Sequence, residues 1–488
     1  MTESNSPPGV TSTENLYPQL FAALGAPHQA AATEPPPVHF RGPTAVLPAC
    51  YDVSGFAALS VALCTAAVAE WQSTQRRQPP AAVTVDRLHA ALAFQSERHL
   101  RGVDTPVPPV WDDISGDYPT TDGFIRLHTA YPYHRAKALT VLGTPADRTA
   151  VAEAVATWGA TALQDAVVAA GGCAAALYTP AEWASHPHGQ HILQQPLCQW
   201  RPASCATEPP PAVPAAHRPL AHLRVLDLTR TIAGPICTRF LAAYGAQVLR
   251  IDPPDFEEVP LLLREVTAGK RRAHLNLKTK AGRNKFDVLL RSADVLVHGY
   301  RPGALDALGY PTDALHNLNP NLINVSLSAY GDSGPWNGRR GFDSLVQMSC
   351  GIAAAGMAKY NRDRPTPLPA QALDHGTGYL MATACLRALS HRALTGYGAN
   401  IKLSLARTAA LLMSLNEPQP TPPTPLTDPL IAKYCTQSSS AFGRLRHIAC
   451  PGQLQGTTPH WDLPAGPLGV DEPSWDGSTA TPPSSDVG

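Results

Sequence analysis

One acidic residue, Asp374, stands alone in the stretch "LPAQALDHGTGYLMATACLRALSHRALTGYG", between an apolar run and a segment of small residues typical of a buried helix. The next acidic residue along the chain is Glu417. A carboxylate at the start of a helix can act as its N-cap, accepting backbone N–H bonds and complementing the helix dipole. An ionised carboxylate can also attack an activated carbonyl carbon as a nucleophile. The two roles are compatible, and we take Asp374 as the candidate nucleophile.

Two further turns carry polar residues that could meet a ligand, "TRTIAGP" (229–235) and "AGKRRAHLNLK" (268–278). Each is predicted to follow a strand, and a doubly wound sheet places its ligands at the carboxyl ends of its strands. Four basic residues of the second turn could pair with phosphate groups, namely Lys270, Arg271, Arg272 and Lys278. A solvated basic hairpin would explain the same spacing.

The common nucleotide, metal and hydrolase motifs are absent. No G-x-G-x-x-G follows a predicted strand, and there is no P-loop, H-E-x-x-H or G-x-S-x-G sequence. The histidine-rich "HPHGQH" (186–191) is interpreted as a polar loop, and no metal site is predicted. The ten cysteines form no C-x-x-C pair, which favours reduced, buried side chains.

Composition restricts the kinds of partner. The 488 residues carry a formal net charge of zero, so no electrostatic footprint indicates nucleic acid or an anionic membrane. The N-terminal "MTESNSPPGV" lacks the features of a secretory signal, and the longest apolar run, 55–71, is too short to span a bilayer comfortably. We therefore expect a cytoplasmic protein.

Strand and helix patterns alternate from residue 219 onward. Strands separated by helices of this length predict parallel βαβ units. The expected strands are 223–229, 247–254, 294–300 and 319–331, and the expected helices between them include 233–246 and 279–293. The predicted fold class is α/β, with a doubly wound, Rossmann-like parallel sheet in a large domain and a smaller α+β domain beside it.

A weak internal repeat links the two halves of the chain. The residue pattern of "AAVTVDRLHAALAF" is similar to that of "ANIKLSLARTAALL" 318 residues later, and each segment follows a long alanine-rich helix. The acid-containing turn "CYDVSGF" resembles "ALDHGTG", which aligns Asp52 loosely with Asp374. Small-residue buried helices resemble one another, so chance similarity is the alternative.

Texture and proline content divide the chain into five segments. The 50 prolines, about twice the usual share, gather at the N-terminus, around 201–219 and after about residue 417. The predicted segments are an acid-turn and helical unit (1–116), a small α+β domain (117–200), a proline-rich linker (201–218), an α/β large domain (219–412) and a proline-rich closing tail (413–488).

The large domain resembles the family III CoA-transferases, the CaiB/BaiF family. "LRVLDLTRTIAGPICTRFLAAYGAQVLRID", "GKRRAHLNLKTKAGR", "ADVLVHGYRPGALDALGY", "NPNLINVSLSAYGDSGPW" and the Asp374 stretch occur in the family's order. The most specific part is the acid turn followed by Ala388, Leu389, Arg392, Thr395, Gly396 and Gly398. Residues 117–200 resemble the family's small domain, so the chain is interpreted as two incomplete copies.

The resemblance implies a function and a site. Family members move CoA between carboxylic acids, use an aspartate as covalent nucleophile, and form homodimers of interlocked subunits with no permanently bound cofactor. It implies Asp374 as the nucleophile, with Gly376 and Gly378 in a turn whose N–H groups would hold oxyanions. It also implies acyl-CoA and a small carboxylic acid as substrates, contacted by Arg230, Thr231, Ala233, Lys270, Arg271, Leu275, Lys278 and Tyr300.

Several positions depart from the family pattern. Ile232 replaces a common Gln, while Gly299 and Thr267 stand where Asn is usual. These departures keep open a degenerate, non-catalytic CoA-binding or scaffold protein. An α-methylacyl-CoA racemase-like enzyme is the third reading, and Phe342 argues against it, because racemases carry a His directly before the acid that corresponds to Asp343.

Overall fold

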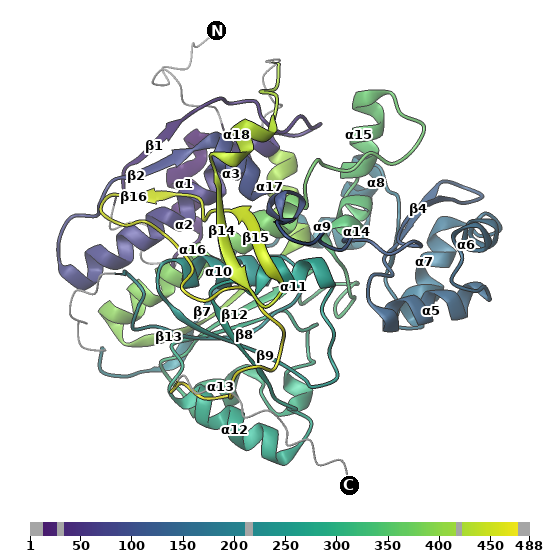
Figure 1. The fold of residues 1–488 in the computed structure, drawn as a ribbon. Helices are drawn as coiled ribbons and strands as arrows, with labels where there is room; N and C mark the ends of the chain where they lie inside the picture. Colours follow the sequence, from purple (N-terminus) through teal and green to yellow (C-terminus); the bar gives the residue numbers. More distant parts are fainter. Residues whose placement is uncertain (1–12, 27–33, 210–217, 416–421, 477–488) are drawn as a thin grey trace.

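A seven-stranded sheet forms the centre of the protein (Figure 1). The computed structural model describes residues 13–26, 34–209, 218–415 and 422–476. Neighbouring strands are parallel except at one edge, where β7 runs antiparallel to β13. In spatial order the strands are β10 (Lys270–His274), β9 (Gln247–Asp252), β8 (Arg224–Leu228), β11 (Val295–His298), β12 (Ile323–Ser328), β13 (Tyr397–Ser404) and β7 (Gln199–Ala206).

The strand order defines where a ligand can enter the sheet. Counted from β8, the six parallel strands lie in the order 3-2-1-4-5-6, which is the order of doubly wound nucleotide-binding sheets. The order reverses between β8 and β11, and crevices at such a switch point are the usual ligand sites. The predicted mixed α/β fold with a parallel sheet is confirmed.

Helices connect the strands and cover the sheet. In α12, Phe286, Leu289 and Leu290 are buried whereas Val288 is exposed, as expected of an amphipathic helix on a sheet. The helices of this half are α10 (Ala233–Ala243), α11 (Pro260–Val266), α12 (Lys280–Arg291), α13 (Thr312–Leu318), α14 (Asp343–Ser349), α15 (Ile352–Tyr360), α16 (Ala372–Thr395) and α17 (Leu405–Ser414).

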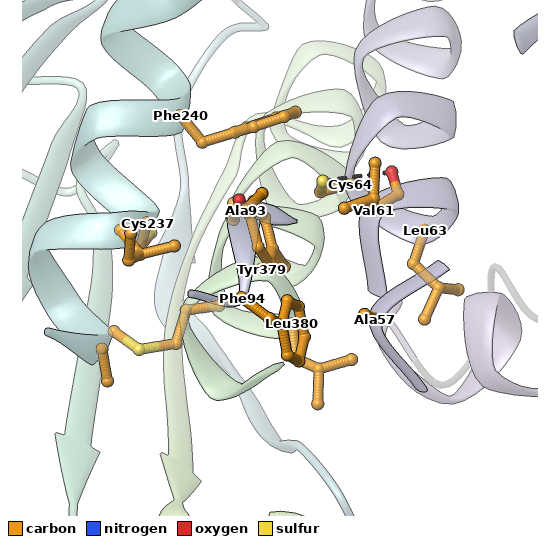
Figure 2. Close-up of a cluster of buried hydrophobic side chains, with 14 of the residues drawn as sticks. Ala57, Val61, Leu63, Cys64, Ala93, Phe94, Cys237, Phe240, Tyr379 and Leu380 are labelled. Atoms are coloured by element: carbon orange, nitrogen blue, oxygen red, sulfur yellow. Dashed lines mark hydrogen bonds between the residues drawn. The ribbon is translucent and has the colours of Figure 1, made fainter. Parts of the chain in front are cut away.

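The long helix α16 packs between α10 and the N-terminal helix α2 (Val53–Arg76). Small residues on both long helices allow a close approach. Figure 2 shows the junction, where Tyr379 of α16 contacts both Phe240 of α10 and Phe94, with ring centres 5.9 Å apart in each pair. Helix α2 is long and apolar enough to cross a membrane, but 94% of its most apolar stretch is buried inside the protein, as in a core helix.

The two related segments have the same order of elements. Helix α2 leads into β2 (Val83–Asp86) and α3 (Arg87–Ala93), as α16 leads into β13 and α17. Asp86 caps α3 and Ser404 caps α17, and these residues are 318 positions apart. The proposed alignment of Asp52 with Asp374 is wrong, however. Asp52 is the N-cap of α2, whereas Asp374 is the third residue of α16, so the two acids occupy different positions in their helices.

A separate antiparallel sheet, β4-β5-β6, forms a small α+β unit with its own core. Val151, Leu163 and Val167 from its helices are fully buried against Ile125 of the sheet. Its elements are β4 (Gly116–Pro119), β5 (Phe124–Leu127), β6 (Ala174–Ala176), α5 (Pro132–Leu142), α6 (Arg148–Val155) and α7 (Ala160–Ala169). Helix α14 of the other half packs against this sheet.

Shorter elements complete the N- and C-terminal parts of the chain. They lie in two further three-stranded sheets, β1-β2-β16 and β14-β15-β3, and in short helices. These are β1 (Val38–Arg41), β3 (Arg101–Gly102), β14 (Cys435–Ser440), β15 (Gly443–Ile448), β16 (Gln453–Leu454), α1 (Tyr17–Ala23), α4 (Ser96–His99), α8 (Pro180–Ser185), α9 (Pro187–Leu193), α18 (Asp428–Ala432) and the 3-10 turns Glu14–Leu16 and Asp306–Leu308.

Three local predictions are corrected. Residues 201–206 are not part of a linker, because they form the edge strand β7 on β13, while 210–217 lie outside the described residues. The predicted turn 268–278 contains the strand β10. The predicted loop 186–191 is mostly helix α9, in which Nε2 of the buried His188 lies 2.7 Å from the Tyr330 carbonyl oxygen.

The contact between α16 and α2 leaves no room at Gly376. A Cβ atom there would lie 2.3 Å from the ring of the buried Phe56. We expect Gly376→Ala to lower the free energy of unfolding by about 1–3 kcal/mol, because overpacking outweighs the gain in helix propensity of at most about 1 kcal/mol. Urea unfolding would measure the loss, with Gly123→Ala, where a Cβ meets nothing within 4 Å, as the control.

A double variant makes this test specific. Gly376→Ala combined with Phe56→Leu should cost less than the sum of the two single changes, since the smaller side chain relieves the clash. Simple additivity would contradict the packing account.

Candidate active site

Asp374 lies in the first turn of α16, with Gln371 rather than Asp374 as the N-cap residue. The capping role considered for its side chain is therefore wrong. Within the described part of the chain, the Asp374 carboxyl group makes no hydrogen bond and no ion pair, although the residue is only 6% exposed. An unengaged buried carboxyl group is costly, so the surrounding fold must hold it in place.

Asp343, the first residue of α14, holds the start of α16. Its Oδ2 accepts hydrogen bonds from the backbone N–H groups of Leu373, at 2.8 Å, and Asp374, at 3.0 Å. Its Oδ1 accepts a bond of 2.5 Å from the Gln347 side chain. Burial raises the pKa of Asp343 to about 6, against the opposing effect of these hydrogen bonds. Asp343 therefore positions Asp374 through the backbone.

The environment of Asp374 favours its protonated form. Burial raises the pKa of Asp374 well above its usual value, and the carboxylates of Asp343 and Glu97 raise it further. Glu97 belongs to α4 in the N-terminal half, and its Oε2 lies 3.0 Å from Nε2 of His375. Two residues distant in sequence thus control the charge of the candidate nucleophile.

Two cavities meet at Asp374. The first has a volume of about 360 Å³, and we call it the arginine-lined cavity because Arg230, Arg301, Arg339 and Arg340 border it. The second, of about 390 Å³, is bordered mainly by hydrocarbon and aromatic side chains, and we call it the apolar chamber. Five residues border both cavities, namely Tyr131, Thr231, Ile232, Phe342 and Asp374.

The arginine-lined cavity lies at the switch point of the sheet. Its walls include the loops after β8 (229–232) and β11 (299–302). The Arg230 guanidinium stacks 3.7 Å from the Phe256 ring centre and lies 5.8 Å from that of Tyr300. Its Nε is 3.6 Å from Asp252. Planar guanidinium groups held in this way suit phosphate recognition.

A buried hydrogen-bond network holds the loop after β8. Thr231 has a positive φ of 68°, a conformation that costs energy for a residue other than glycine. Its backbone N–H donates to Glu258 at 3.2 Å, and its hydroxyl lies 3.0 Å from that of Tyr131. Tyr131 donates to Glu258 at 2.6 Å, and Arg250 donates to the same carboxylate at 3.0 Å. The network fixes the loop against Asp374.

The predicted CoA contacts divide into two groups. Arg230, Thr231, Ala233 and Tyr300 border the arginine-lined cavity. The other four, Lys270, Arg271, Leu275 and Lys278, border neither cavity. For them a role in binding CoA is not supported by their position.

Lys270 has a structural role instead. Its side chain is fully buried, and Nζ lies 2.9 Å from Asp227 and 3.1 Å from the Pro235 carbonyl oxygen. Burial lowers the pKa of Lys270 to about 8, against the effect of Asp227, which raises it. Arg271 donates to the carbonyl oxygen of Ser474 in the C-terminal tail at 2.6 Å. Both residues are held within the fold.

Gly376 and Gly378 do not form an open turn. Both lie inside α16, where their N–H groups belong to the helical hydrogen-bond ladder. Their small size serves packing, because a Cβ at Gly378 would lie 2.5 Å from the Ala233 carbonyl oxygen of α10. The expectation that their N–H groups hold an oxyanion is corrected.

No sequence motif indicates the residues that the N-terminal half brings to the site. Glu97, Trp111, His128 and Tyr131 border the apolar chamber, but none belongs to a motif. The His128 ring stacks on Phe342 with centres 3.7 Å apart, and burial lowers the pKa of His128 to about 3. The sequence indicates Asp343 only as the acid that follows Phe342.

A third cavity, of about 560 Å³, lies at the carboxyl ends of β11, β12 and β13 and shares Tyr300 and Arg301 with the arginine-lined cavity. Among the described residues, no group of three His, Cys, Asp or Glu side chains could hold a metal ion.

The model of "CoA-transferase family III" matches residues 220–425. This segment is a family III CoA-transferase domain. The resemblance drawn from the motifs is thereby confirmed. The match includes the loops after β8 and β11, Asp343 and Asp374, but it excludes the N-terminal residues that border the apolar chamber.

Curated relatives match the same half. The acetyl-coenzyme A transferase nodX of Hypoxylon pulicicidum is 33% identical over 241 residues, which is 47% of this chain and 40% of the relative. The formyl-CoA:oxalate CoA-transferase of Escherichia coli O81 is 33% identical over 200 residues, 38% of this chain and 47% of the relative.

A third relative has a known structure. The probable fatty acyl-CoA transferase Rv3272 of Mycobacterium tuberculosis is 31% identical over 253 residues, 46% of this chain and 63% of the relative. Its crystal structure gives a TM-score of 0.37 with 32% identity, over 40% of this chain and 56% of that one. The chain thus spans about two fifths to three fifths of the length of these curated relatives.

The raised pKa of Asp374 predicts a pH dependence. Only the ionised carboxylate is nucleophilic, so covalent capture of an acyl group by Asp374 should be slow at mildly acidic pH and accelerate as the pH rises. Glu97→Gln removes one of the negative charges that raise this pKa. The acceleration should therefore occur at lower pH in the variant, as measured by the rate of adduct formation in intact-mass spectra across a pH series.

The control is Glu153→Gln, an exposed acid on α6 that should leave the profile unchanged. A Glu97→Gln profile that coincides with the native one, or that moves to higher pH, would contradict the electrostatic account.

Proposed function

We propose that the protein is a CoA-transferase that moves CoA from an acyl-CoA thioester to a carboxylic acid, with Asp374 as covalent nucleophile. One observation carries the proposal: the Asp374 carboxyl group, which has no partner within the described ranges, borders both an arginine-lined cavity and an apolar chamber, in a family III domain. The first cavity suits the polyanionic CoA, and the second suits the acyl group. The homodimeric assembly and the cytoplasmic location expected from the resemblance stay predictions.

The chemistry follows from the carboxylate. An ionised Asp374 oxygen attacks the thioester carbon, a C–O bond forms, and the C–S bond breaks as the CoA thiolate leaves with its electron pair. The thiolate then attacks the Asp374 carbonyl carbon of the mixed anhydride, which releases the donor acid as a carboxylate and leaves an aspartyl-CoA thioester. The acceptor carboxylate repeats the two steps in reverse, which regenerates Asp374.

Backbone donors for the developing oxyanion are available in the first turn of α10. Ala233 and Gly234 border the arginine-lined cavity, and first-turn N–H groups have no acceptor within their own helix. A single well-placed donor of this kind is worth roughly 3–4 kcal/mol of barrier. These residues replace Gly376 and Gly378 in the proposed mechanism.

The alternative of a non-catalytic CoA-binding protein rests on the departures from the family pattern. Some of these residues border a cavity and others do not, so they do not support the alternative equally. Thr267 is buried away from both cavities, where its hydroxyl accepts a hydrogen bond of 3.1 Å from the Gly466 N–H. Packing therefore explains why Thr267 stands where the family usually has Asn. Ile232 and Gly299 do border the arginine-lined cavity, so they would affect CoA affinity.

Intact-mass spectrometry tests the proposal directly. The full chain would be incubated with a panel of acyl-CoA thioesters and quenched with hydroxylamine or borohydride. We expect a covalent adduct on the native protein that Asp374→Asn abolishes and that Asp52→Asn, the helix-cap acid of α2, retains. CoA binding without an adduct from any donor would instead support the non-catalytic alternative.

A racemase-like reaction is the second candidate, and His128 is the observation behind it. His128 and Asp374 border the same chamber, so an imidazole and a carboxyl group are available at one cavity for two proton transfers. This reaction would incorporate deuterium at the α-carbon of a 2-methylacyl-CoA in D₂O, and His128→Phe would abolish the incorporation. Absence of exchange in a protein that forms the Asp374 adduct would exclude it.

A further inference from the structure

The apolar chamber has a composition that indicates a class of substrate. Its hydrocarbon and aromatic border comes from both halves of the chain and consists of Pro109, Val110, Trp111, Ala130, Tyr131, Ile232, Val259, Leu262 and Phe342. The volume of about 390 Å³ falls in the range of small-ligand sites, about 300–1,000 Å³. A cavity of this size and lining favours an apolar body over a small polar acid.

We propose that this chamber holds the hydrocarbon part of the acyl group, so that the enzyme selects carboxylic acids with a bulky apolar body, aliphatic or aromatic, over acetate-sized acids and over dicarboxylic acids. This inference rests on the proposed function for the identity of the reacting group. It adds the substrate class, which the family III domain by itself leaves open.

The charges around the chamber oppose a second carboxylate. Asp343, Asp374 and Glu97 all border it, so an additional anion would meet three acids. Glu97 is paired with His375, and Asp343 accepts hydrogen bonds from backbone N–H groups. Neither carboxyl group is therefore available to donate a hydrogen bond to a second carboxylate of the substrate. Arg98 is the cation at the border, and its side chain is exposed, so solvent screens its charge.

The chamber does offer polar atoms, and they suit a single polar group. Ser344 Oγ and His128 Nδ1 are buried and make no hydrogen bond within the described part of the chain. Both residues border the chamber, and burial keeps His128 neutral. Neutral donors of this kind can accommodate a carbonyl or neutral carboxyl oxygen without the cost of burying a charge.

The residues expected to select the acyl group lie partly outside the matched family III segment. Residues 97–98, 109–111 and 128–131 supply one side of the chamber, and all of them precede the family III segment 220–425. The chamber also shares its border with the arginine-lined cavity at Asp374, Ile232 and Phe342. A thioester whose CoA occupied one cavity would therefore direct its acyl group into the other.

Binding of free acids tests the inference independently of catalysis. Isothermal titration of the full chain with acetate, butanoate, hexanoate, octanoate, phenylacetate and adipate would give a dissociation constant for each. We expect affinity to rise by about fourfold for each added methylene until the chamber is filled. Phenylacetate should bind more tightly than acetate, and adipate more weakly than hexanoate.

Two variants test whether the apolar chamber is responsible for the preference among acids. Trp111→Ala removes a wall residue that is 37% exposed, and it should weaken hexanoate and phenylacetate several-fold while leaving acetate unchanged. Ala130→Leu fills part of the chamber and should move the preference to shorter acids. Tyr360→Ala, an exposed aromatic on α15 outside both cavities, is the matched control and should keep the native profile.

The outcomes separate the inference from the proposed function. An affinity that does not depend on chain length, a preference for adipate, or a profile that neither chamber variant changes would overturn the inference, even if acyl-CoA thioesters label Asp374. A chain-length dependence that Trp111→Ala and Ala130→Leu alter would support it. That result without any Asp374 adduct would count against the transferase function alone.

Discussion

Helix α16 is buried over most of its length between α2 and α10, and this packing fixes the place of Asp374. Gly376 and Gly378 let the neighbouring helices approach within contact distance of the α16 backbone, so the first turn of the helix cannot move without disturbing the core. Asp343 then binds two backbone N–H groups of that turn. The carboxyl group of Asp374 has no partner among the described residues and lies at the junction of two cavities.

The same burial has an electrostatic consequence. Three carboxyl groups lie close together in surroundings of low polarity, and the charged form of Asp374 is disfavoured by burial, by Asp343 and by Glu97. A carboxylate at such a site is also poorly solvated once it is ionised. The fold offsets other buried charges by pairing, as between Lys270 and Asp227 or between Arg250 and Glu258.

Much of the parallel sheet could be predicted, because each of its units is local. The predicted bounds nearly coincide with those of the structure for β8 (predicted 223–229), β9 (predicted 247–254) and α12 (predicted 279–293). Predictions from composition failed where tertiary contacts override the local structure that the composition favours. Residues 201–206, predicted as the start of a proline-rich linker, form a strand because β13 offers an open edge. The basic segment after Gly269 is also a strand, and its first residue, Lys270, has a buried partner in Asp227.

The sequence by itself determined the α/β architecture, the family of the second half and Asp374 as the residue of interest, since periodicity and motifs are properties of contiguous residues. Only the tertiary structure decided what surrounds Asp374. Glu97, Trp111, His128 and Tyr131 reach the site from residues more than 200 positions away, through the packing of the N-terminal half on α16 and α14. No local pattern encodes such a meeting, because it depends on how separately formed elements bury their apolar faces against one another.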